Sequence, residues 1–375
     1  MTGCGVISPY GRGVEALWRG LVGGHSAARP ITRFRADDLT PNVAAEVTEP
    51  LPDDADRAGV FALDAARQAL ADAGLGAAPP DAGVVLGTTL GGMEIFETWV
   101  GEARDDLGHV PYFAPAARVA RTLGCAGPVV TPQLACASGT HALAMAADLV
   151  RRGAADVVLA GGTDLLCRFV VAGFNALRAT APSAHPFDRD RSGLILGEGA
   201  AVVVIESAAY AAARGARVRA RLAGMGAAAD ATHMTAPDRE GGGAARAMAA
   251  ALADAGITPA AVDFVSAHGT GTVYNDAMEA RALVRVFGPG GVAVNSIKGA
   301  VGHMLGAAGA LEAVLCIEVM ARGLIPPTIG LREVDPACGA LDLVRDAPRP
   351  QDTRVALSTS SGFAGANAAL LFTTP

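Results

Sequence analysis

Short runs of apolar, often β-branched residues alternate along this chain with longer alanine-rich stretches whose apolar positions follow a helical spacing. An apolar run that ends in a glycine turn predicts a buried strand, whereas apolar residues at i, i+3 and i+4 predict a helix. In the first half, the pattern predicts a helix over residues 139–152 and strands at 81–87, 127–134, 155–162 and 200–206.

The second half repeats this alternation. Helices are predicted over 276–286 and 306–322, and strands at 262–267, 291–296, 354–358 and 368–372. Strands that alternate with helices indicate an α/β fold in layers with buried sheets. The halves meet near 207–217 without a low-complexity linker and look like two copies of one unit. We therefore expect residues 1–207 and 208–375 to pack as one body.

Composition narrows the class of protein. The chain of 375 residues is 51% hydrophobic but only 5% aromatic, which predicts a core of aliphatic side chains. Every long apolar run is broken by Gly, Pro or charge, so no membrane-spanning segment is expected. A net charge of -7 argues against a nucleic-acid or anionic membrane surface. Six cysteines without Cys-x-x-Cys spacing indicate reduced thiols in a cytoplasmic protein, with no zinc site.

The first candidate for chemistry is Cys136, in the segment Leu134-Ala135-Cys136-Ala137-Ser138-Gly139-Thr140. It lies between a predicted strand end and a predicted helix start. The N–H groups and the dipole of a helix start favour a thiolate and lower its pKa, as an activated nucleophile requires. The alternative is a buried small hydrophobic residue, the commoner role of a free cysteine.

Two histidine segments follow predicted strands in the second half. His268 lies in Ser266-Ala267-His268-Gly269-Thr270-Gly271-Thr272, where glycines let the backbone approach a ligand and threonines offer hydroxyls. His303 follows Lys298, the single lysine of a chain whose other basic residues are arginines. A compact ammonium retained here suggests a small cation in a tight space. Each feature has an alternative explanation. His268 can be an ordinary turn histidine, the segment with His303 can be a glycine-rich stretch that packs helices, and the single lysine can be retained by chance.

A fourth segment lies near the C-terminus, at Ser360-Ser361-Gly362-Phe363-Ala364-Gly365-Ala366-Asn367. Its glycines and its aromatic tip are typical of a mobile loop between two strands. A tight hairpin turn explains the glycines equally well.

In this order, these segments resemble the elongating β-ketoacyl-acyl-carrier-protein synthases of the thiolase superfamily. The resemblance covers nearly the whole chain, including 230–237 and the run from Pro186-Phe187-Asp188 to Gly197-Glu198-Gly199. A Cys-His-His set separates this branch from initiating synthases, with Cys-His-Asn, and from thiolases, with a second cysteine. Chain-length-factor partners lack the nucleophile that Cys136 supplies. The resemblance implies a thiolase-like fold of duplicated βαβ halves in αβαβα layers.

The resemblance also implies a decarboxylative Claisen condensation in fatty acid or polyketide biosynthesis. Cys136 would take an acyl group from a thioester, with the oxyanion held by the backbone N–H groups of Cys136 and Phe363. His268 and His303 would donate hydrogen bonds to a malonyl thioester, or activate a water, as carbon dioxide leaves. The enolate would then attack the acyl-cysteine and give a β-ketoacyl thioester.

The remaining roles follow from the same resemblance. Lys298 would pair with Glu312 on the next helix and orient His303. Thr270 and Thr272 would hydrogen-bond the pantetheine amides. No metal or organic cofactor is expected, because the substrates ride on the phosphopantetheine of an acyl carrier protein and decarboxylation drives the condensation.

Phe363 would gate the acyl pocket, and Phe96 would lie at the pocket end, near the dimer interface, where a smaller aliphatic residue is common in the family. Ala364 stands where the gating loop usually has glycine, which predicts a stiffer gate. The expected assembly is a homodimer or a heterodimer with a related ketosynthase-like subunit.

The chain departs from the family in two further places. It begins at Met1-Thr2-Gly3-Cys4, so either the first strand is lost or the start is assigned too late. The region that is often basic for carrier docking reads Asp53-Asp54-Ala55-Asp56-Arg57. Docking would then rely on other arginines, for which Arg151, Arg152 and Arg178 are candidates.

Two other functions remain open from the sequence. The first is acyl transfer to an amine or hydroxyl acceptor without decarboxylation, against which the complete Cys-His-His set argues. The second is a non-catalytic partner subunit, against which Cys136 argues. Release of carbon dioxide from a malonyl thioester discriminates the first from a condensing enzyme, and acylation by a thioester excludes the second.

Overall fold

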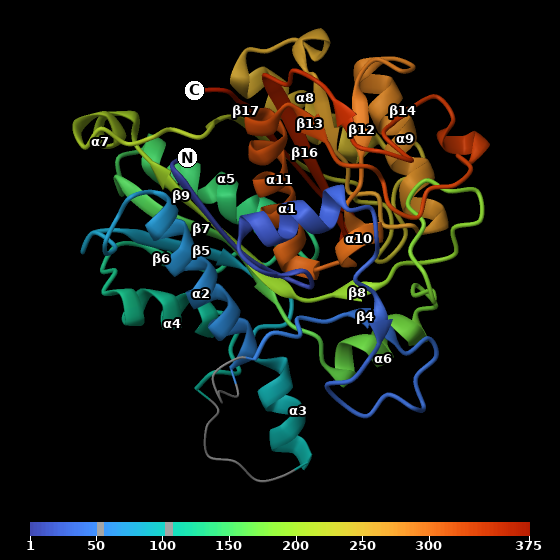
Figure 1. Ribbon diagram of the computed structural model, residues 1–375, viewed down its shortest axis with the longest axis horizontal. Helices are drawn as coiled ribbons and strands as arrows, with labels where there is room; N and C mark the ends of the chain where they lie inside the picture. The colour runs from blue at the N-terminus through green and yellow to red at the C-terminus, as the bar shows by residue number, and fades with distance from the viewer. Residues whose placement is uncertain (51–55, 102–107) are drawn as a thin grey trace.

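The computed structural model describes residues 1–50, 56–101 and 108–375. Two six-stranded mixed sheets lie face to face with helices between them and on both outer sides (Figure 1). The first sheet comes from residues before position 207 and the second from residues after it. The boundary at 207/208 itself stays a prediction.

The first sheet has the strand order β2-β1-β9-β7-β5-β6. β1 runs antiparallel to β9 and β9 to β7, whereas β7, β5 and β6 are parallel. Because β1 pairs with β9 over five residues from Gly3 to Ile7, the first strand is not lost. The strands are β1 (Gly3–Ser8), β2 (Gly11–Arg12), β5 (Gly83–Gly87), β6 (Val129–Val130), β7 (Val157–Asp164) and β9 (Gly199–Glu206).

The second sheet repeats this plan in the order β10-β17-β16-β11-β12-β14. Its pairings β10–β17 and β17–β16 are antiparallel, like β1–β9 and β9–β7, and its other pairings are parallel, so β11 and β12 occupy the places of β5 and β6. The duplication expected from the sequence is confirmed at the level of strand order. The strands are β10 (Arg221–Ala229), β11 (Phe264–Ser266), β12 (Ala293–Asn295), β14 (Asp342–Leu343), β16 (Val355–Gly362) and β17 (Ala366–Thr373).

Helices complete five layers, which confirms the αβαβα arrangement. Two helices contact each other between the sheets, and each outer face is covered by two more (Figure 1). The central helices are α5 (Ser138–Arg151) and α11 (Ala308–Arg322). The outer helices are α2 (Arg57–Asp72) and α4 (Ala114–Leu123) on the first sheet, and α8 (Gly242–Ala255) and α9 (Val273–Phe287) on the second.

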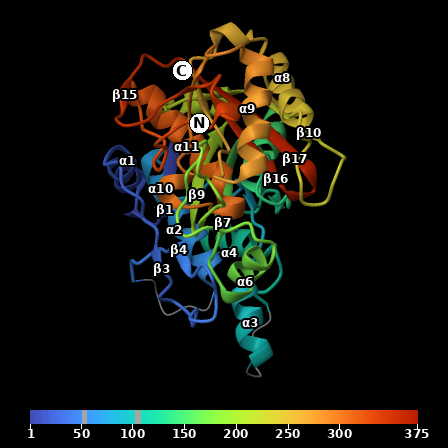
Figure 2. The same cartoon turned by 90° about the vertical axis from the view of Figure 1, so that its right-hand side faces the viewer.

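The other elements decorate this frame. Figure 2 shows α3 extending away from the layered body. Among the described residues, no helix combines the length and the apolar character needed to cross a membrane. These elements are α1 (Val14–Val22), α3 (Met93–Gly101), α6 (Arg168–Ala176), α7 (Ala208–Ala213), α10 (Lys298–Val301), β3 (Arg29–Pro30), β4 (Val43–Ala45), β8 (Leu196–Gly197), β13 (Leu324–Ile325), β15 (Arg349–Pro350) and 3₁₀ turns at Pro259–Ala261, Leu305–Ala307, Pro336–Cys338 and Phe363–Gly365.

Two predicted elements differ from the structure. The strand expected over 127–134 is reduced to Val129–Val130, because Pro128 and Pro132 lack the N–H that a longer ladder would need. The segment 360–367 is a tight hairpin, since β16 continues to Gly362 and β17 begins at Ala366. The mobile-loop interpretation is therefore replaced by the hairpin alternative.

Candidate active site

Cys136 lies in the turn between β6 and the central helix α5. Ala135 adopts a left-handed φ of 48°, which is unusual for a residue with a side chain. The hydroxyl of Ser138 accepts from Leu134 N at 2.8 Å and donates to Ala135 O at 2.6 Å, so it braces the turn from inside. The strained turn presents Cys136 at the start of the helix, as the sequence predicted.

Two cavities meet at Cys136. The first, of about 330 Å³, is also lined by both histidines, and the second, of about 510 Å³, is lined by residues of α6 and of the segments that follow β5 and β6. Phe363 lines both and stacks on Phe174 of α6 with ring centroids 5.7 Å apart. The two rings stand where one cavity passes into the other. The lining of the first cavity includes Cys136, Arg178, Ser192, Gly193, His268, Thr270, Thr272, Val273, His303 and Phe363, and that of the second includes Cys136, Leu90, Val170, Leu177, Leu305 and Phe363.

The structure brings His268 and His303 together from two different segments of the second half. Both are buried, and their rings meet edge to face with centroids 5.2 Å apart. Burial lowers the pKa of each imidazole well below its usual value, and the charge of Lys298 lowers it further. Both rings are therefore neutral at physiological pH.

The two histidines differ in what fixes their protons. His303 Nδ1 faces the N–H of Leu305 at 3.2 Å and so accepts a hydrogen bond. A neutral His303 must then carry its proton on Nε2, which makes that atom a donor. His268 Nδ1 is buried, and no group in the described ranges pairs with it. Nothing there holds His268 in one tautomer, so it can donate or accept.

The thiol corrects one expectation. The position of Cys136 before a helix predicted a lowered pKa, but burial raises the pKa of the Cys136 thiol to about 12. The charge of Lys298 acts in the opposite direction, and the carboxylate of Asp164 adds to the rise. Desolvation of the thiolate outweighs the local charges, because Cys136 is buried. The resting nucleophile is a neutral thiol beside two neutral imidazoles.

The expected pair between Lys298 and Glu312 is present. Their side chains form an ion pair and are only 2% and 1% exposed. Burial raises the pKa of Glu312 to about 7, although Lys298 lowers it. Lys298 influences His303 through its charge, which lowers the pKa of that ring.

Two buried carboxylates that sequence reasoning missed hold the His268 segment. On α9, Glu279 accepts from the N–H groups of His268 and Gly269, both at 2.7 Å. Asp276 accepts from the next two N–H groups in the chain, at 3.0 and 3.1 Å. Four consecutive backbone donors thus end on one face of one helix. The signal was available, since the carboxylates are three residues apart in the predicted helix 276–286.

Asp164, at the end of β7, was missed as well. It accepts from Thr88 and Thr89 of the first half, and from Gly306 N of the second half at 2.6 Å. This carboxylate fixes the segment that follows β5 against the turn before α11. No single stretch of sequence signals it, because its donors lie far apart in the chain.

The predicted substrate-contacting residues are only partly brought together. Thr270 and Thr272 line the first cavity, with their hydroxyl oxygens 2.9 Å apart. Phe96, on α3, lies outside the lining of both cavities and is 40% exposed, with its ring 5.7 Å from Trp99. Its place at a pocket end stays a prediction that depends on a second subunit.

The three arginines proposed for carrier docking differ in their surroundings. Arg151 pairs with Asp254 and Arg152 with Asp148, each at 2.9 Å. Arg178 lines the first cavity, and within the described ranges no carboxylate lies within ion-pair distance of it. The acidic residues Asp53 and Asp54 lie outside the described residues.

Within residues 1–50, 56–101 and 108–375, no group of three or more His, Cys, Asp or Glu is arranged to hold a metal ion.

Duplicated sheets around paired central helices, with a buried cysteine at the start of one of them, define a thiolase-like enzyme. Residues 1–211 match the N-terminal domain of beta-ketoacyl synthases, and residues 219–332 match their C-terminal domain. The chain therefore belongs to the β-ketoacyl synthase family.

Individual relatives are similar over almost their full length. Nodulation protein E of Rhizobium sp. (strain N33) is 40% identical, covering 99% of this chain and 98% of the relative. The 3-oxoacyl-acyl-carrier-protein synthase 2 of Coxiella burnetii is 37% identical, covering 99% and 97%. Among solved structures, the ishigamide ketosynthase/chain length factor superposes with a TM-score of 0.94 at 39% identity, covering 100% of this chain and 98% of that one.

Proposed function

We propose that this chain is a β-ketoacyl-acyl-carrier-protein synthase that joins an acyl thioester to a malonyl thioester with loss of carbon dioxide. The observation that carries the proposal is the single cavity that contains Cys136, His268 and His303. A thiol and two neutral imidazoles supply a nucleophile, a proton acceptor and a hydrogen-bond donor, as the two half-reactions require.

In the first half-reaction, Cys136 attacks the acyl carbonyl. Because the thiol is neutral at rest, its proton must leave as the C–S bond forms, and His268 is the ring free to accept it. When the tetrahedral intermediate collapses, the C–S bond to the pantetheine breaks, and His268 returns the proton to the leaving thiolate and is neutral again. The oxyanion is stabilised by the N–H groups of Cys136 and Phe363. Residue 362 lies close by, since a Cβ built on Gly362 would be 3.2 Å from Cys136 N. Each such donor contributes about 3 kcal/mol to the transition state.

In the second half-reaction, a malonyl thioester occupies the first cavity. His303 Nε2–H donates to its thioester carbonyl, together with His268 once that ring can again donate. The C–C bond to the carboxylate breaks and carbon dioxide leaves. The electron pair of the broken bond stays on the remaining carbon and forms the enolate. The enolate carbon attacks the acyl carbon, the C–S bond to Cys136 breaks, and a β-ketoacyl thioester results. The released Cys136 thiolate takes a proton from water and returns to the neutral thiol. The charge of Lys298 opposes that of the enolate.

The acyl donor and the malonyl group arrive on the phosphopantetheine of an acyl carrier protein, the carrier that names the Coxiella relative. Thr270 and Thr272 contact the amides of the arm as it passes through the first cavity. Arg178, at the same cavity, is the arginine best placed for an anionic group of the carrier. The acyl chain extends past Phe363 into the second cavity, whose lining is mostly apolar.

A second subunit completes the enzyme as a homodimer or as a heterodimer with a chain-length-factor-like partner. The ishigamide protein, by its title a ketosynthase/chain length factor, supports the second assembly. In such a pair this chain is the catalytic member, because it carries Cys136. Exposed aromatic residues on α3, Phe96 and Trp99, offer apolar surface for such a contact.

The test is incubation with an acyl thioester and malonyl-acyl carrier protein. We expect carbon dioxide release coupled one to one with a β-ketoacyl product. Acyl transfer to an amine or hydroxyl without carbon dioxide would identify the alternative enzyme class. Absence of any acyl adduct on the chain would exclude a catalytic role.

A further inference from the structure

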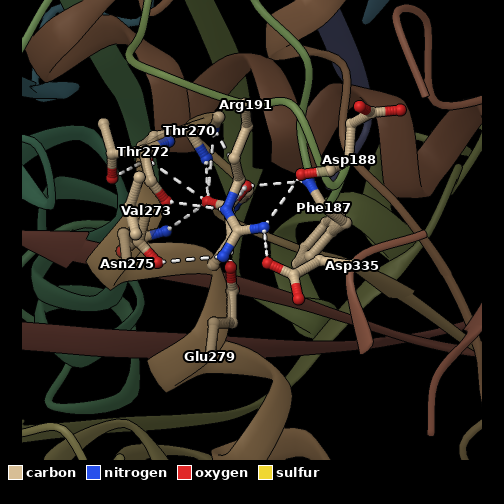
Figure 3. Close-up of polar contacts among 12 residues, drawn as sticks. Phe187, Asp188, Arg191, Thr270, Thr272, Val273, Asn275, Glu279 and Asp335 are labelled. Atoms are coloured by element: carbon tan, nitrogen blue, oxygen red, sulfur yellow. Dashed lines mark hydrogen bonds and ion pairs between the residues drawn. The ribbon is translucent and has the colours of Figure 1, made fainter. Parts of the chain in front are cut away.

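The run that begins Pro186-Phe187-Asp188 contributes no group to the mechanism above, yet it contains a buried cation. Arg191 is only 2% exposed, and Figure 3 shows its guanidinium surrounded by polar groups from several segments. A buried arginine is costly unless it is paired and hydrogen-bonded. The arrangement of its partners indicates why this one is present.

The guanidinium collects backbone carbonyls at the start of α9. Arg191 Nε donates to Thr272 O at 3.2 Å, and Nη2 donates to Val273 O at 3.0 Å. Nη1 donates to Asp188 O at 2.9 Å and forms an ion pair with Asp335 (Figure 3). All three nitrogens of the planar fork are engaged, which a lysine ammonium could not reproduce.

A cation at the start of α9 is electrostatically unfavourable, because a helix N-terminus carries partial positive charge. Two carboxylates offset that cost. Asp335 pairs directly, and Asp276 Oδ2 lies 3.9 Å from Arg191 Nε. Asp276 in turn accepts from the N–H groups of Thr270 and Gly271. Arg191 therefore binds the carbonyls of this turn, while its neighbouring carboxylate binds the N–H groups.

The same residue joins two walls of the first cavity. Ser192 and Gly193, which follow Arg191, line that cavity beside the turn. Gly193 N donates to Gly271 O at 3.1 Å. Gly271 has a φ of 80°, and a Cβ there would lie 3.0 Å from Gly193 O, so the walls meet backbone to backbone. Movement of the turn would change both walls together.

We propose that Arg191 is a positioning residue for the pantetheine arm: it fixes the turn 270–273 against residues 192–193, so that Thr270 and Thr272 present their hydroxyls to the arm. This proposal rests on the function proposed above. It adds to that function a residue that touches neither substrate nor Cys136, and it assigns the effect to the arm rather than to the reacting atoms.

The test compares two acyl donors on the full chain. One is an acyl-pantetheine thioester, and the other is the p-nitrophenyl ester of the same acyl group, which lacks the arm. In Arg191→Met, we expect kcat/KM for acylation by the pantetheine donor to fall about 10- to 100-fold, chiefly through KM. The ester should acylate Cys136 within about threefold of wild type, because the turn does not contact it.

Two further variants frame the result. Arg191→Lys retains the charge near Asp276 but loses the fork, so we expect an intermediate loss with the pantetheine donor. Arg189→Met is the matched control, since Arg189 is an exposed arginine on the same segment that pairs with Asp190 and Glu333. It should behave as wild type with both donors.

The outcomes separate the two proposals. Failure of wild type to be acylated by either donor would contradict the proposed function. If wild type is acylated, two results would overturn the role of Arg191 alone. One is an equal loss for both donors in folded Arg191 variants, and the other is no loss for the pantetheine donor. If Arg191→Met does not fold, Asp335→Asn replaces it. It should show a loss of about threefold or more that is confined to the pantetheine donor, and equal behaviour of both donors would overturn the proposal.

Discussion

The two halves of this chain share a frame but not a chemistry. In each half, two antiparallel pairings (β1–β9 and β9–β7, or β10–β17 and β17–β16) lead into parallel ones, and each half contributes one central helix. The first sheet has a third antiparallel pairing, between β1 and the short edge strand β2. In the first half, the turn after β6 carries Cys136. In the second half, the segments after β11 and β12 carry His268, Lys298 and His303. Duplication thus places two sets of turns at one junction, and the residues in them divide the work.

The turns after β5 and β11 make the comparison sharper. In each turn, backbone N–H groups donate to a buried carboxylate from another element. Asp164, at the end of β7, holds the turn after β5, and Glu279, on α9, holds the turn after β11. Only the second turn carries an imidazole. Similar backbone support therefore holds different side chains: the turn after β5 carries Thr88 and Thr89, whereas the turn after β11 carries His268.

Removal of the nucleophile should have the largest effect. Cys136→Ala is expected to abolish the acyl-enzyme, because no second thiol lines the first cavity within the described ranges. Intact mass after incubation with an acyl thioester measures this. Cys125→Ala, a change outside both cavities, should acylate normally. An acyl adduct on Cys136→Ala would show that the turn after β6 does not supply the nucleophile, and would contradict the division of chemistry between the halves.

Changes in the second half should leave more function. His268→Ala and His303→Ala are each expected to lower condensation by roughly 10²-fold or more, the usual scale for acid-base groups. Because His303 is fixed as a donor, His303→Ala should still acylate, whereas His268→Ala should acylate slowly. Separate rates of acylation and carbon dioxide release test this. Near-normal condensation in both variants would sink the mechanism.

Lys298→Arg should not be conservative. The ammonium is buried against Glu312, and a wider guanidinium would displace the segment that carries His303. A misplacement of about 1 Å can reduce the rate on the order of 10²-fold. Condensation rates for Lys298→Arg and Lys298→Ala measure the effect. A wild-type rate in the arginine variant would show that the lysine has no special role.

The pH dependence of the free thiol gives a smaller but direct effect. Since the pKa of Cys136 is raised to about 12, its thiolate fraction should increase about tenfold per pH unit throughout pH 7–10. Iodoacetamide alkylation of Cys136, followed by peptide mapping, should accelerate accordingly without a plateau. In the urea-denatured chain, the rate should level off above about pH 8.5, the ordinary thiol value. A plateau of the rate below pH 8 in the folded chain would show that the pKa of Cys136 is lowered, as its position at the helix start predicted.

Phe96 should have the smallest effect. If a second subunit turns this ring toward the acyl chain, Phe96→Ala would admit longer chains. Each buried methylene contributes about 0.8 kcal/mol, or roughly fourfold in selection. Acylation rates across a series of chain lengths, in the dimeric protein, measure this. An unchanged length preference would assign Phe96 to the subunit contact alone.

Local patterns predicted the frame well and the electrostatics poorly. The helix expected over 306–322 is observed as Ala308–Arg322, because its apolar spacing is sustained over several turns. The position of Cys136 was also predicted, from a strand end followed by a helix start. Its pKa was not, because burial depends on both halves closing over the thiol.

The supporting residues show the same division. Lys298 and Glu312 are 14 residues apart, and their pairing was predicted from the family resemblance. Arg191 and Asp335 are 144 residues apart, and neither stands out in its own segment. Their meeting follows from the packing of the segment that carries Arg191, in the first half, against the second half, and no local spacing encodes that contact. A local pattern can identify a reactive group, but not the distant residues that hold it.

One measurement tests the division between the halves most directly: the intact mass of the His303→Ala chain after an acyl thioester is added, and again after malonyl-acyl carrier protein is added. The account predicts an acyl adduct that maps to the peptide containing Cys136 and persists in the second step, while wild type loses it and releases carbon dioxide. Loss of the adduct at the wild-type rate, or an adduct on another residue, would contradict the account.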